Sequence, residues 1–542
     1  MKCFCTSRMH GKEHLSCICH DIPLKTQTAD FLTTARPSIV VNIMSRKIIP
    51  VLILIAAALL LAAGCTQPAA ENRSAGKLDG FDDFVTQKMT EYEVPGAVVG
   101  IVDNDSVVYL KGFGVREINK PGKVDPDTRF QIASVTKYIT AQAIGTLVDE
   151  GKLTWDTPVV TYMPGFMLND PYVSEHVTLR DLLAHRTGLK EYDGDTLGRL
   201  GYSNSEMLER MRYLNQTYGF RERYAYSNAG YFIAGEVAAT ADHKSWENLT
   251  DARIIRPLNM TRSGAHPETL YLDDNHVVAH GGSEGNVTVI PLEEAAFPAG
   301  GQVVSTGRDM TQILRMMLND GSVDGRQVLT QKTVSDIHAA SMVAGRDGPL
   351  GDPNGAVCLG CDAYSFLGER VIEKNGALEG VRAIVILIPD KKVGLVVIAN
   401  KQLTVFPEAV RDEFLERYIG RSGVDLQARE KLNQKGWYSL MKNMDVPAEI
   451  KPATIPVSAI AGSYTSNLYG TMIIKEGPDA GNMTVLLGPA KYPGTLVHQT
   501  NDTWYLSWPN PDDAVSYLTF TANSSGTVTG FTSSDYGPFT RA

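Results

Sequence analysis

The chain has 542 residues, of which 43% are hydrophobic and 21% are charged, and its formal net charge is −10. This length and composition are typical of a globular protein with two or three domains that each bury a core. The negative charge argues against non-specific nucleic-acid binding, and the sequence contains neither a Walker-type loop nor a His-Glu-x-x-His helix. We therefore expect no nucleic-acid partner, no metal and no cofactor.

The first 43 residues contain the pairs Cys3-x-Cys5 and Cys17-x-Cys19 beside several histidines, a composition that also suits metal binding. A better secretory start lies at Met44. We therefore interpret residues 1–43 as an upstream segment that is not translated or is disordered. A metal-binding extension remains the alternative.

A lipoprotein signal is predicted over residues 44–64. Arg46 and Lys47 precede an apolar run that ends at Ala63 and is shorter than the roughly 20 residues of a membrane-spanning helix. The run ends in Leu61-Ala62-Ala63-Gly64-Cys65, which predicts a lipidated N-terminus at Cys65 and a tether over 65–78. We expect an exported protein anchored to the membrane. Ala62 stands where leucine is commoner, which leaves a soluble secreted form open.

Two pairs of strands are predicted at opposite ends of the segment 79–421. A helical pattern over Phe81 to Tyr92 precedes strands at Ala97 to Val102 and Ser106 to Lys111. The second pair is predicted at Val381 to Ile388 and Val393 to Ala399, followed by a helix from Pro407. Helices and long loops fill the region between. We expect an α+β domain in which both pairs join one antiparallel sheet, with a helical block on one side and the terminal helices on the other.

The chain after residue 421 is divided into a charged, helix-prone linker (422–454) and an all-β domain (455–542). The latter contains six short strand-like runs, the first at Gly470 to Lys475, separated by Gly, Asn, Asp and Pro turns. This pattern predicts a meander or small barrel. Cys358 and Cys361 are the other cysteines of the exported chain, and we favour a local disulfide over a redox pair or half of a metal site.

Ser134 and Lys137 are the candidate nucleophile and base. They stand at the start of a predicted helix, and residues three apart share a helix face. A buried lysine has a lowered pKa, so its neutral amine can take the serine proton. The free N–H groups of the first helical turn stabilise a developing oxyanion. Ser-x-x-Lys also occurs at Ser74 and Ser439, in a polar linker and late in the chain.

Tyr226-Ser227-Asn228 is the second candidate motif. A phenol placed between two lysines can be held as a phenolate and relay protons, and Asn228 can hydrogen-bond a substrate amide. A second copy, Tyr202-Ser203-Asn204, precedes a polar helix, whereas Asn228 precedes an apolar one. His185 ends another predicted helix, and we interpret it as a structural hydrogen-bonding residue rather than a partner of Ser134.

Lys374-Asn375-Gly376-Ala377 is the third candidate motif. On an edge strand, Lys374 brings an ammonium beside the phenol, Gly376 permits a close approach of the backbone, and Ala377 N–H is a second oxyanion donor beside that of Ser134. Other Lys-x-Gly tripeptides, at Lys120, Lys392 and Lys475, lie in turns or in the C-terminal domain. Gly281 to Gly285 matches a lipase-type nucleophile elbow but lacks the helix that an elbow requires.

The ordered set Ser134-x-x-Lys137, Tyr226-Ser-Asn228 and Lys374-x-Gly376 resembles the serine β-lactamase and penicillin-binding-protein superfamily. The closest branch holds class C β-lactamases, D-Ala-D-Ala carboxypeptidases, D-aminopeptidases and β-lactamase-like esterases. Stretches at Leu182 to Leu189, Ile255 to Thr261 and Pro298 to Gly301 also match. The C-terminal domain resembles the lipocalin-like barrels appended to some members.

The resemblance implies an acyl-enzyme serine hydrolase acting on an amide or ester, such as a β-lactam, a D-amino-acid peptide or a small ester. It implies acylation of Ser134, with Lys137 and Tyr226 as bases and Lys374 tuning the charge. Asn375 stands where the superfamily usually has Thr or Ser to hold a substrate carboxylate, which leaves esterase or D-amino-acid peptidase activity open. The alternative is a binding or sensor protein on the same scaffold that does not hydrolyse its ligand.

Overall fold

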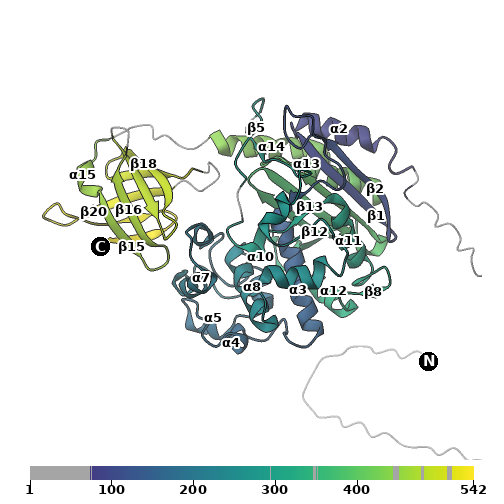
Figure 1. Ribbon diagram of the computed structural model, residues 1–542, viewed down its shortest axis with the longest axis horizontal. Helices are drawn as coiled ribbons and strands as arrows, with labels where there is room; N and C mark the ends of the chain where they lie inside the picture. Colours follow the sequence, from purple (N-terminus) through teal and green to yellow (C-terminus); the bar gives the residue numbers. More distant parts are fainter. Residues whose placement is uncertain are drawn as a thin grey trace, which may run out of the picture. The chain divides into compact units, whose positions relative to one another are not determined.

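The computed structural model describes residue 74 and residues 76–282, 284–292, 295–345, 350, 352–442, 451–477, 481–509 and 516–542 (Figure 1). The predicted upstream segment, signal peptide and Cys65 lie outside the described residues. None of the described helices has the length and apolarity needed to cross a membrane.

The centre of the large domain is an eight-stranded sheet, in which all the pairs of neighbouring strands are antiparallel. The two predicted strand pairs lie side by side in it, where Ala97 pairs with Ala399, so the prediction of one shared sheet is confirmed. In the order in which they lie side by side, the strands are β2 (Ser106–Gly114), β1 (Gly96–Asp103), β14 (Val393–Ala399), β13 (Val381–Ile388), β12 (Glu369–Leu378), β11 (Asp362–Phe366), β10 (Ala356–Val357) and β9 (Met342–Val343).

Helices cover both faces of this sheet. On one face, α2 (Phe81–Glu91) and α13 (Phe406–Tyr418) pack in a single apolar cluster with alternate residues of β1, β13 and β14. On the other face, α11 (Gly307–Leu318) contacts β1 and β14. Every residue of β1, β13 and β14 is buried, which explains why these strands read as continuous apolar runs rather than alternating ones.

The helical block is built around α3 (Thr136–Asp149), whose residues are buried as far as Leu147. Helices α8 (Asn228–Asp242), α10 (Pro298–Gly301) and α12 (Gln331–His338) contact it. A capping box of Thr178 and Asp181 starts α6 (Leu179–Leu183), as expected for a helix at this point. The remaining helices of the block are α4 (Val159–Tyr162), α5 (Pro171–His176), α7 (Asn204–Arg210) and α9 (Trp246–Thr250).

The predicted linker contains a long helix, α14 (Leu426–Lys442), that contacts α13. Gln434 accepts a hydrogen bond from the backbone N–H of Val405, and Glu430 pairs with Arg411. These polar contacts, rather than an apolar stripe, attach the helix, which explains why its sequence shows little core pattern.

The C-terminal domain is a closed eight-stranded barrel, so the prediction of an all-β domain is confirmed. The first and last strands, which close it through the pair Tyr464 and Arg541, were not among the predicted runs because they are short and rich in Gly, Ser and Thr. The strands are β15 (Gly462–Ser466), β16 (Gly470–Glu476), β17 (Asn482–Leu487), β18 (Tyr492–Thr500), β19 (Thr503–Ser507), β20 (Ser516–Ala522), β21 (Val528–Ser533) and β22 (Gly537–Arg541).

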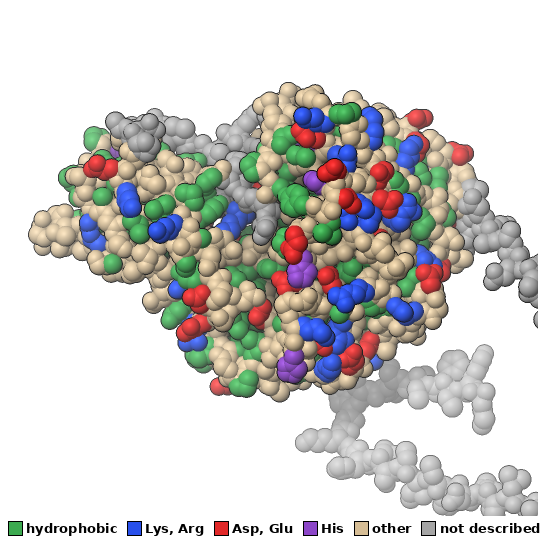
Figure 2. Space-filling model, viewed as in Figure 1, with side chains coloured by type: hydrophobic (Ala, Val, Ile, Leu, Met, Phe, Trp, Pro, Cys, Tyr) green, Lys and Arg blue, Asp and Glu red, His purple; other side chains and the backbone are tan. Residues whose placement is uncertain are grey.

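Turns of the barrel hydrogen-bond to the segment that precedes α7. The backbone N–H of Ala490 donates to the carbonyl of Leu200, and the hydroxyl of Tyr202 donates to the carbonyl of Tyr469. The second copy of the Tyr-Ser-Asn motif therefore has a structural role: Tyr202 contacts the barrel, and Ser203 caps α7. On the face shown in Figure 2, acidic and basic side chains are interspersed over the large domain.

Candidate active site

Ser134 lies on a tight turn between a short strand and the central helix. Strand β3 (Phe130–Gln131) leads into a 3₁₀ turn over Ala133–Val135, and α3 follows at once. Ala133 has φ +49°, in the left-handed region that non-glycine residues rarely adopt. Ser134 is partly exposed whereas Ala133 and Val135 are buried, so the turn presents the hydroxyl alone to a cavity.

Lys137 lies one turn further along the chain and is completely buried. Its Nζ contacts Ser134 Oγ at 3.1 Å, Asn228 Oδ1 at 2.6 Å and the carbonyl oxygen of Gly300 at 2.7 Å. Burial, and then the positive charge of Lys374, lowers the pKa of Lys137 well below its usual value. A neutral amine that donates to Asn228 and Gly300 has its lone pair left for the proton of Ser134.

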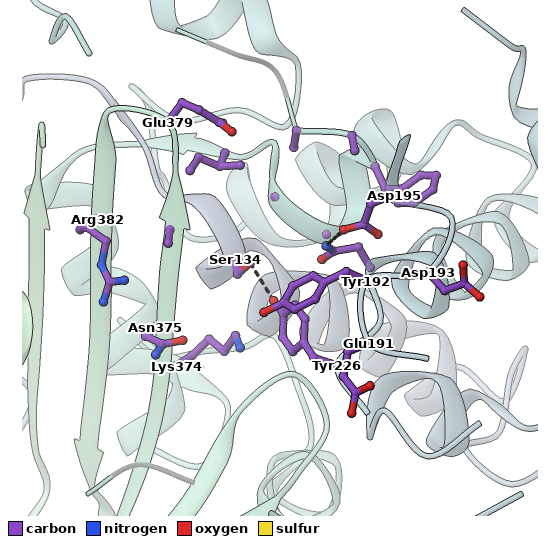
Figure 3. A pocket seen from close by; sticks show the side chains of 18 of the residues that line it. Ser134, Glu191, Tyr192, Asp193, Asp195, Tyr226, Lys374, Asn375, Glu379 and Arg382 are labelled. Carbon is purple, nitrogen blue, oxygen red and sulfur yellow. Dashed lines mark hydrogen bonds between the residues drawn. The ribbon is translucent and has the colours of Figure 1, made fainter. Parts of the chain in front are cut away.

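Tyr226 and Asn228 stand at the start of α8, where Ser227 caps the helix by accepting from the N–H of Gly230. The Tyr226 hydroxyl donates to Ser134 Oγ at 2.8 Å (Figure 3). Burial raises the pKa of Tyr226 rather than lowering it, so the resting side chain is a phenol. The expectation of a phenolate is therefore wrong, because desolvation outweighs the hydrogen bond to Ser134, and the carboxyl groups of Asp195 and Asp362 raise the pKa of Tyr226 further.

Asp195 is a site residue that was not predicted from the sequence. Its Oδ2 accepts a hydrogen bond of 2.6 Å from Asn228 Nδ2, while Asn228 Oδ1 accepts from Lys137. The carboxylate thus fixes which end of the amide faces the lysine. Burial raises the pKa of Asp195 to about 7. No motif marks this residue, because its loop approaches the site only in the folded chain.

Lys374, Asn375, Gly376 and Ala377 lie on β12, which is an interior strand, so the prediction of an edge strand is wrong for the strand as a whole. The pairing of β12 with β11 nevertheless ends at Glu373, so from Lys374 onward only β13 pairs with it. Lys374 Nζ lies 5.3 Å from the centre of the Tyr226 ring. The motif therefore occupies a local free edge that lines the same cavity as Ser134.

The backbone of Gly376 lies directly against the turn that carries Ser134. A Cβ at this position would stand 2.5 Å from the carbonyl oxygen of Ile132 and 3.0 Å from the amide nitrogen of Ser134. Only glycine permits this approach. Asn375 and Ala377, on either side, are exposed to the cavity.

His185 has the structural role that its sequence position indicated. Its Nδ1 accepts a hydrogen bond of 3.0 Å from the backbone N–H of Ser227, and its ring packs 4.6 Å from that of Tyr226. Burial and the two lysines lower the pKa of His185 well below its usual value, so the ring is neutral. It supports the tyrosine without touching Ser134 Oγ.

The other motif copies do not reach this site. Gly281 ends the two-residue strand β4 (His280–Gly281), and a second strand, β5 (Thr288–Val289), follows where an elbow needs a helix; Ser283 lies outside the described residues.

Cys358 and Cys361 are both free and buried, so the favoured disulfide is not formed. Their turn instead packs against the start of α3, where Gly360 contacts the carbonyl of Lys137.

The cavity in front of Ser134 has a volume of about 830 Å³. Its walls are rich in charged side chains, and the segment 190–196 contributes Lys190. The same segment contributes Glu191, Asp193 and Asp195 (Figure 3). Aromatic residues of the barrel, among them Tyr469 and Trp508, also line it. Tyr469 is hydrogen-bonded to the backbone of Gly194, next to Asp195.

Comparison with known proteins agrees with the fold and with the predicted resemblance. The Beta-lactamase family profile matches residues 81–418. "Unguisins hydrolase ungD'" of Aspergillus campestris is 24% identical over 421 residues, which cover 73% of this chain and 77% of the relative. "Protein flp" of Staphylococcus aureus is 25% identical over 338 residues, which cover 61% of this chain and 64% of the relative.

Two solved structures share this architecture at low sequence identity. An octameric penicillin-binding protein homologue from Pyrococcus abyssi superposes with a TM-score of 0.56 at 21% identity, covering 85% of this chain and 99% of that one. A D-stereospecific amidohydrolase from Streptomyces sp. gives a TM-score of 0.51 at 19% identity, covering 62% of this chain and 98% of that one. At these identities the likeness concerns the fold.

Proposed function

The chain belongs to the beta-lactamase family, whose members hydrolyse amides and esters through an acylated serine, and we propose that it is itself such a serine hydrolase, acylated at Ser134. The observation that carries the proposal is the convergence of two side chains on Ser134 Oγ: Lys137 Nζ at 3.1 Å and Tyr226 Oη at 2.8 Å. A buried amine and a phenol placed on one hydroxyl are the parts that nucleophilic catalysis requires.

Acylation begins with proton transfer from Ser134 to the neutral amine of Lys137. The Ser134 oxygen forms a bond to the substrate carbonyl carbon, and the carbonyl electron pair moves to its oxygen. When the tetrahedral species collapses, the bond to the leaving group breaks and the departing nitrogen or oxygen takes the Tyr226 proton. The Lys137 ammonium returns a proton to Tyr226. Water then enters in the place of the leaving group and reverses these roles to release the acid.

The negative charge on the substrate oxygen needs donors that are already in position. The N–H of Ser134 lies at the start of a helix, and the free edge of β12 brings Gly376, the neighbour of Ala377, against it. We assign these two N–H groups to the oxyanion hole. Removal of one such donor typically costs about 10²–10³ in kcat.

The substrate is proposed to be an amide or ester of modest size: a β-lactam, a D-amino-acid peptide or a small ester. Asn375 stands where the superfamily usually has a hydroxyl that holds a substrate carboxylate, which leaves ester and D-amino-acid peptide substrates open beside β-lactams. A curated relative named as a hydrolase of unguisins supports hydrolytic activity, although its identity of 24% supports no particular substrate.

Export and anchoring through Cys65 are proposed from the signal-like sequence alone. Cell fractionation tests this proposal: wild-type protein is expected with the membranes, and Cys65→Ser in the soluble extracytoplasmic fraction. Equal membrane association of both proteins would refute the anchor without affecting the proposed activity.

Labelling with a fluorescent fluorophosphonate tests the assignment of the nucleophile. The wild-type protein is expected to be labelled, and Ser134→Ala is expected to lose the label. Ser439→Ala, which changes another Ser-x-x-Lys serine, is the matched control and should keep it. A label that persists in Ser134→Ala would refute the assignment. Steady-state rates with nitrocefin, short-chain p-nitrophenyl esters and D-amino-acid amides then rank the substrate classes.

A further inference from the structure

Tyr192 is an aromatic residue exposed at the active-site cavity. Its side chain is 61% exposed although it lines the cavity in front of Ser134. The centre of its ring lies 5.3 Å from that of Tyr226, and the two ring planes are tilted by 48° (Figure 3). An exposed aromatic ring beside a catalytic group is a surface on which an apolar ligand can be buried.

The backbone of Tyr192 is strained. Its φ is +60°, a left-handed conformation that is uncommon for a bulky residue and that costs free energy. Two hydrogen bonds hold it: the Tyr192 N–H donates to the carbonyl of Tyr226 at 2.9 Å, and its carbonyl accepts from the N–H of Asp195 at 3.2 Å. Strain of this kind persists where the surroundings fix it, and it concentrates at functional sites.

A turn alone does not require a tyrosine here. Gly194, two residues further along the same loop, adopts φ +83° without the steric penalty. Glycine at position 192 would keep both backbone hydrogen bonds and remove the strain. The backbone conformation therefore does not explain a tyrosine at position 192, and the feature that a glycine would lack is the aromatic ring. Most of the surface of this ring is not covered by the protein.

We propose that Tyr192 is a specificity-determining residue whose ring forms a wall of a subsite for an apolar, preferably aromatic, group next to the scissile bond. This inference rests on the proposed hydrolase function, because it concerns substrates that acylate Ser134. The ring contacts the substrate group directly, and its position on Tyr226 places that group beside the residue that protonates the leaving atom.

Four esters test the subsite and locate it: ethyl acetate, ethyl phenylacetate, benzyl acetate and benzyl phenylacetate, which carry an aromatic ring on neither side, one side or both sides of the scissile bond. Hydrolysis is followed by proton release. The wild-type enzyme is expected to prefer ring-bearing esters in kcat/KM. Tyr192→Ala and Tyr192→Gly should reduce that preference about tenfold, and Tyr192→Phe should keep it, because the ring and not the hydroxyl makes the contact.

Tyr271→Ala is the matched control, since Tyr271 is 62% exposed and does not line the cavity. It should leave the preference unchanged. A wild-type enzyme without any preference for ring-bearing esters, or an equal preference in wild type and Tyr192→Ala, would overturn the proposal. Absence of fluorophosphonate labelling in the wild type would instead refute the hydrolase function itself, so the two failures are distinguishable.

Thermal denaturation separates the proposed role from a purely structural one. Tyr192→Gly is expected to melt at or above the wild-type temperature and above Tyr192→Ala, because glycine relieves the left-handed strain that alanine retains. If the ring served only to hold the loop, Tyr192→Gly would melt lower and would lose rate equally on all four esters. That result would contradict the proposal.

Discussion

The backbone of Gly376 lies so close to that of Ser134 that a Cβ on Gly376 would come within 3.0 Å of the Ser134 nitrogen. This contact joins two segments that are far apart in the sequence, the turn before α3 and the free edge of β12. The spacing between them determines whether both assigned N–H donors can reach one substrate oxygen.

Gly376→Ala is expected to reduce the acylation rate by about 10²-fold or more, because the added methyl group pushes the strand away from the Ser134 amide. The rate of fluorophosphonate labelling, measured beside circular dichroism, checks this. Gly165→Ala is the control, since no atom lies within 4 Å of a Cβ there. Unchanged labelling of Gly376→Ala would exclude the proposed oxyanion hole.

The pH dependence of kcat/KM is expected to shift in opposite directions in two variants. Activity requires neutral Lys137, so it rises as the pH passes upward through the pKa of that amine. Lys374 lowers this pKa and Asp195 raises it. Lys374→Met should therefore move the acidic limb to higher pH, and Asp195→Asn should move it to lower pH.

Complete pH profiles of the two variants and the wild type, collected with one uncharged ester, measure these shifts. The rings of Tyr226 and Tyr231, at 4.9 and 5.3 Å from Lys137 Nζ, are present in all three proteins and cancel in the comparison. Shifts of the same sign in both variants would show that the acidic limb does not belong to Lys137.

Gly360→Ala is expected to destabilise the protein by more than left-handed strain alone. Gly360 has φ +82°, and its Cβ would stand 2.5 Å from the carbonyl oxygen of Lys137. Gly151 has a similar φ of +71°, but no atom lies within 4 Å of a Cβ there. The loss of stability in Gly151→Ala therefore measures the left-handed strain alone, which is about 1–2 kcal/mol. Urea denaturation should give the larger loss for Gly360→Ala, and equal losses would disprove the close contact.

Arg411→Met is expected to cost about 3–5 kcal/mol of stability, since it removes a buried positive charge from three buried carboxylates and leaves Arg429 as the cation that pairs with Asp412 and Glu430. Arg411 Nη atoms pair with Glu373, Asp412 and Glu430, all of them buried. Arg308→Met, which breaks an exposed pair with Asp127, is the control and should cost roughly 0–1 kcal/mol.

The deficit of Arg411→Met should be larger at pH 8 than at pH 5. Burial raises the pKa of Glu373 to about 7 and that of Asp412 to about 6, above their values in an unfolded chain. A raised folded pKa means that stability falls as the pH rises, and removal of Arg411 raises these pKa values further. Urea denaturation at both pH values measures the difference, and a deficit independent of pH would contradict this account.

Much of the fold could be predicted because its signals are local. The apolar runs of β13 and β14, the capping box of α6 and the turn residues of the barrel each follow from a few neighbouring residues. The strands β15 and β22 were missed because barrel closure, and not an apolar pattern, keeps them in place.

The candidate site could be predicted only where a motif carries it. Ser134, Lys137 and Tyr226 stand at helix starts with recognisable spacing, and the structure brings them together. Tyr192 lies on an irregular loop, and Asp195 begins the 3₁₀ helix Asp195–Arg199 that follows it. The position of this segment depends on hydrogen bonds from its backbone to residues 226 and 469, and no local sequence pattern predicts such contacts. The protonation of Tyr226 was mispredicted because burial is a property of the folded chain.

The groups around Ser134 Oγ come from residues 137, 226, 228, 300 and 374. The sheet that supports them is complete only when β14 pairs with β1. Such long-range contacts form late during folding, because the intervening loops must first be ordered. A nascent chain released before β14 would thus lack a chemically competent centre. We therefore expect recovery of activity after denaturation to follow the assembly of this sheet rather than the formation of the individual helices.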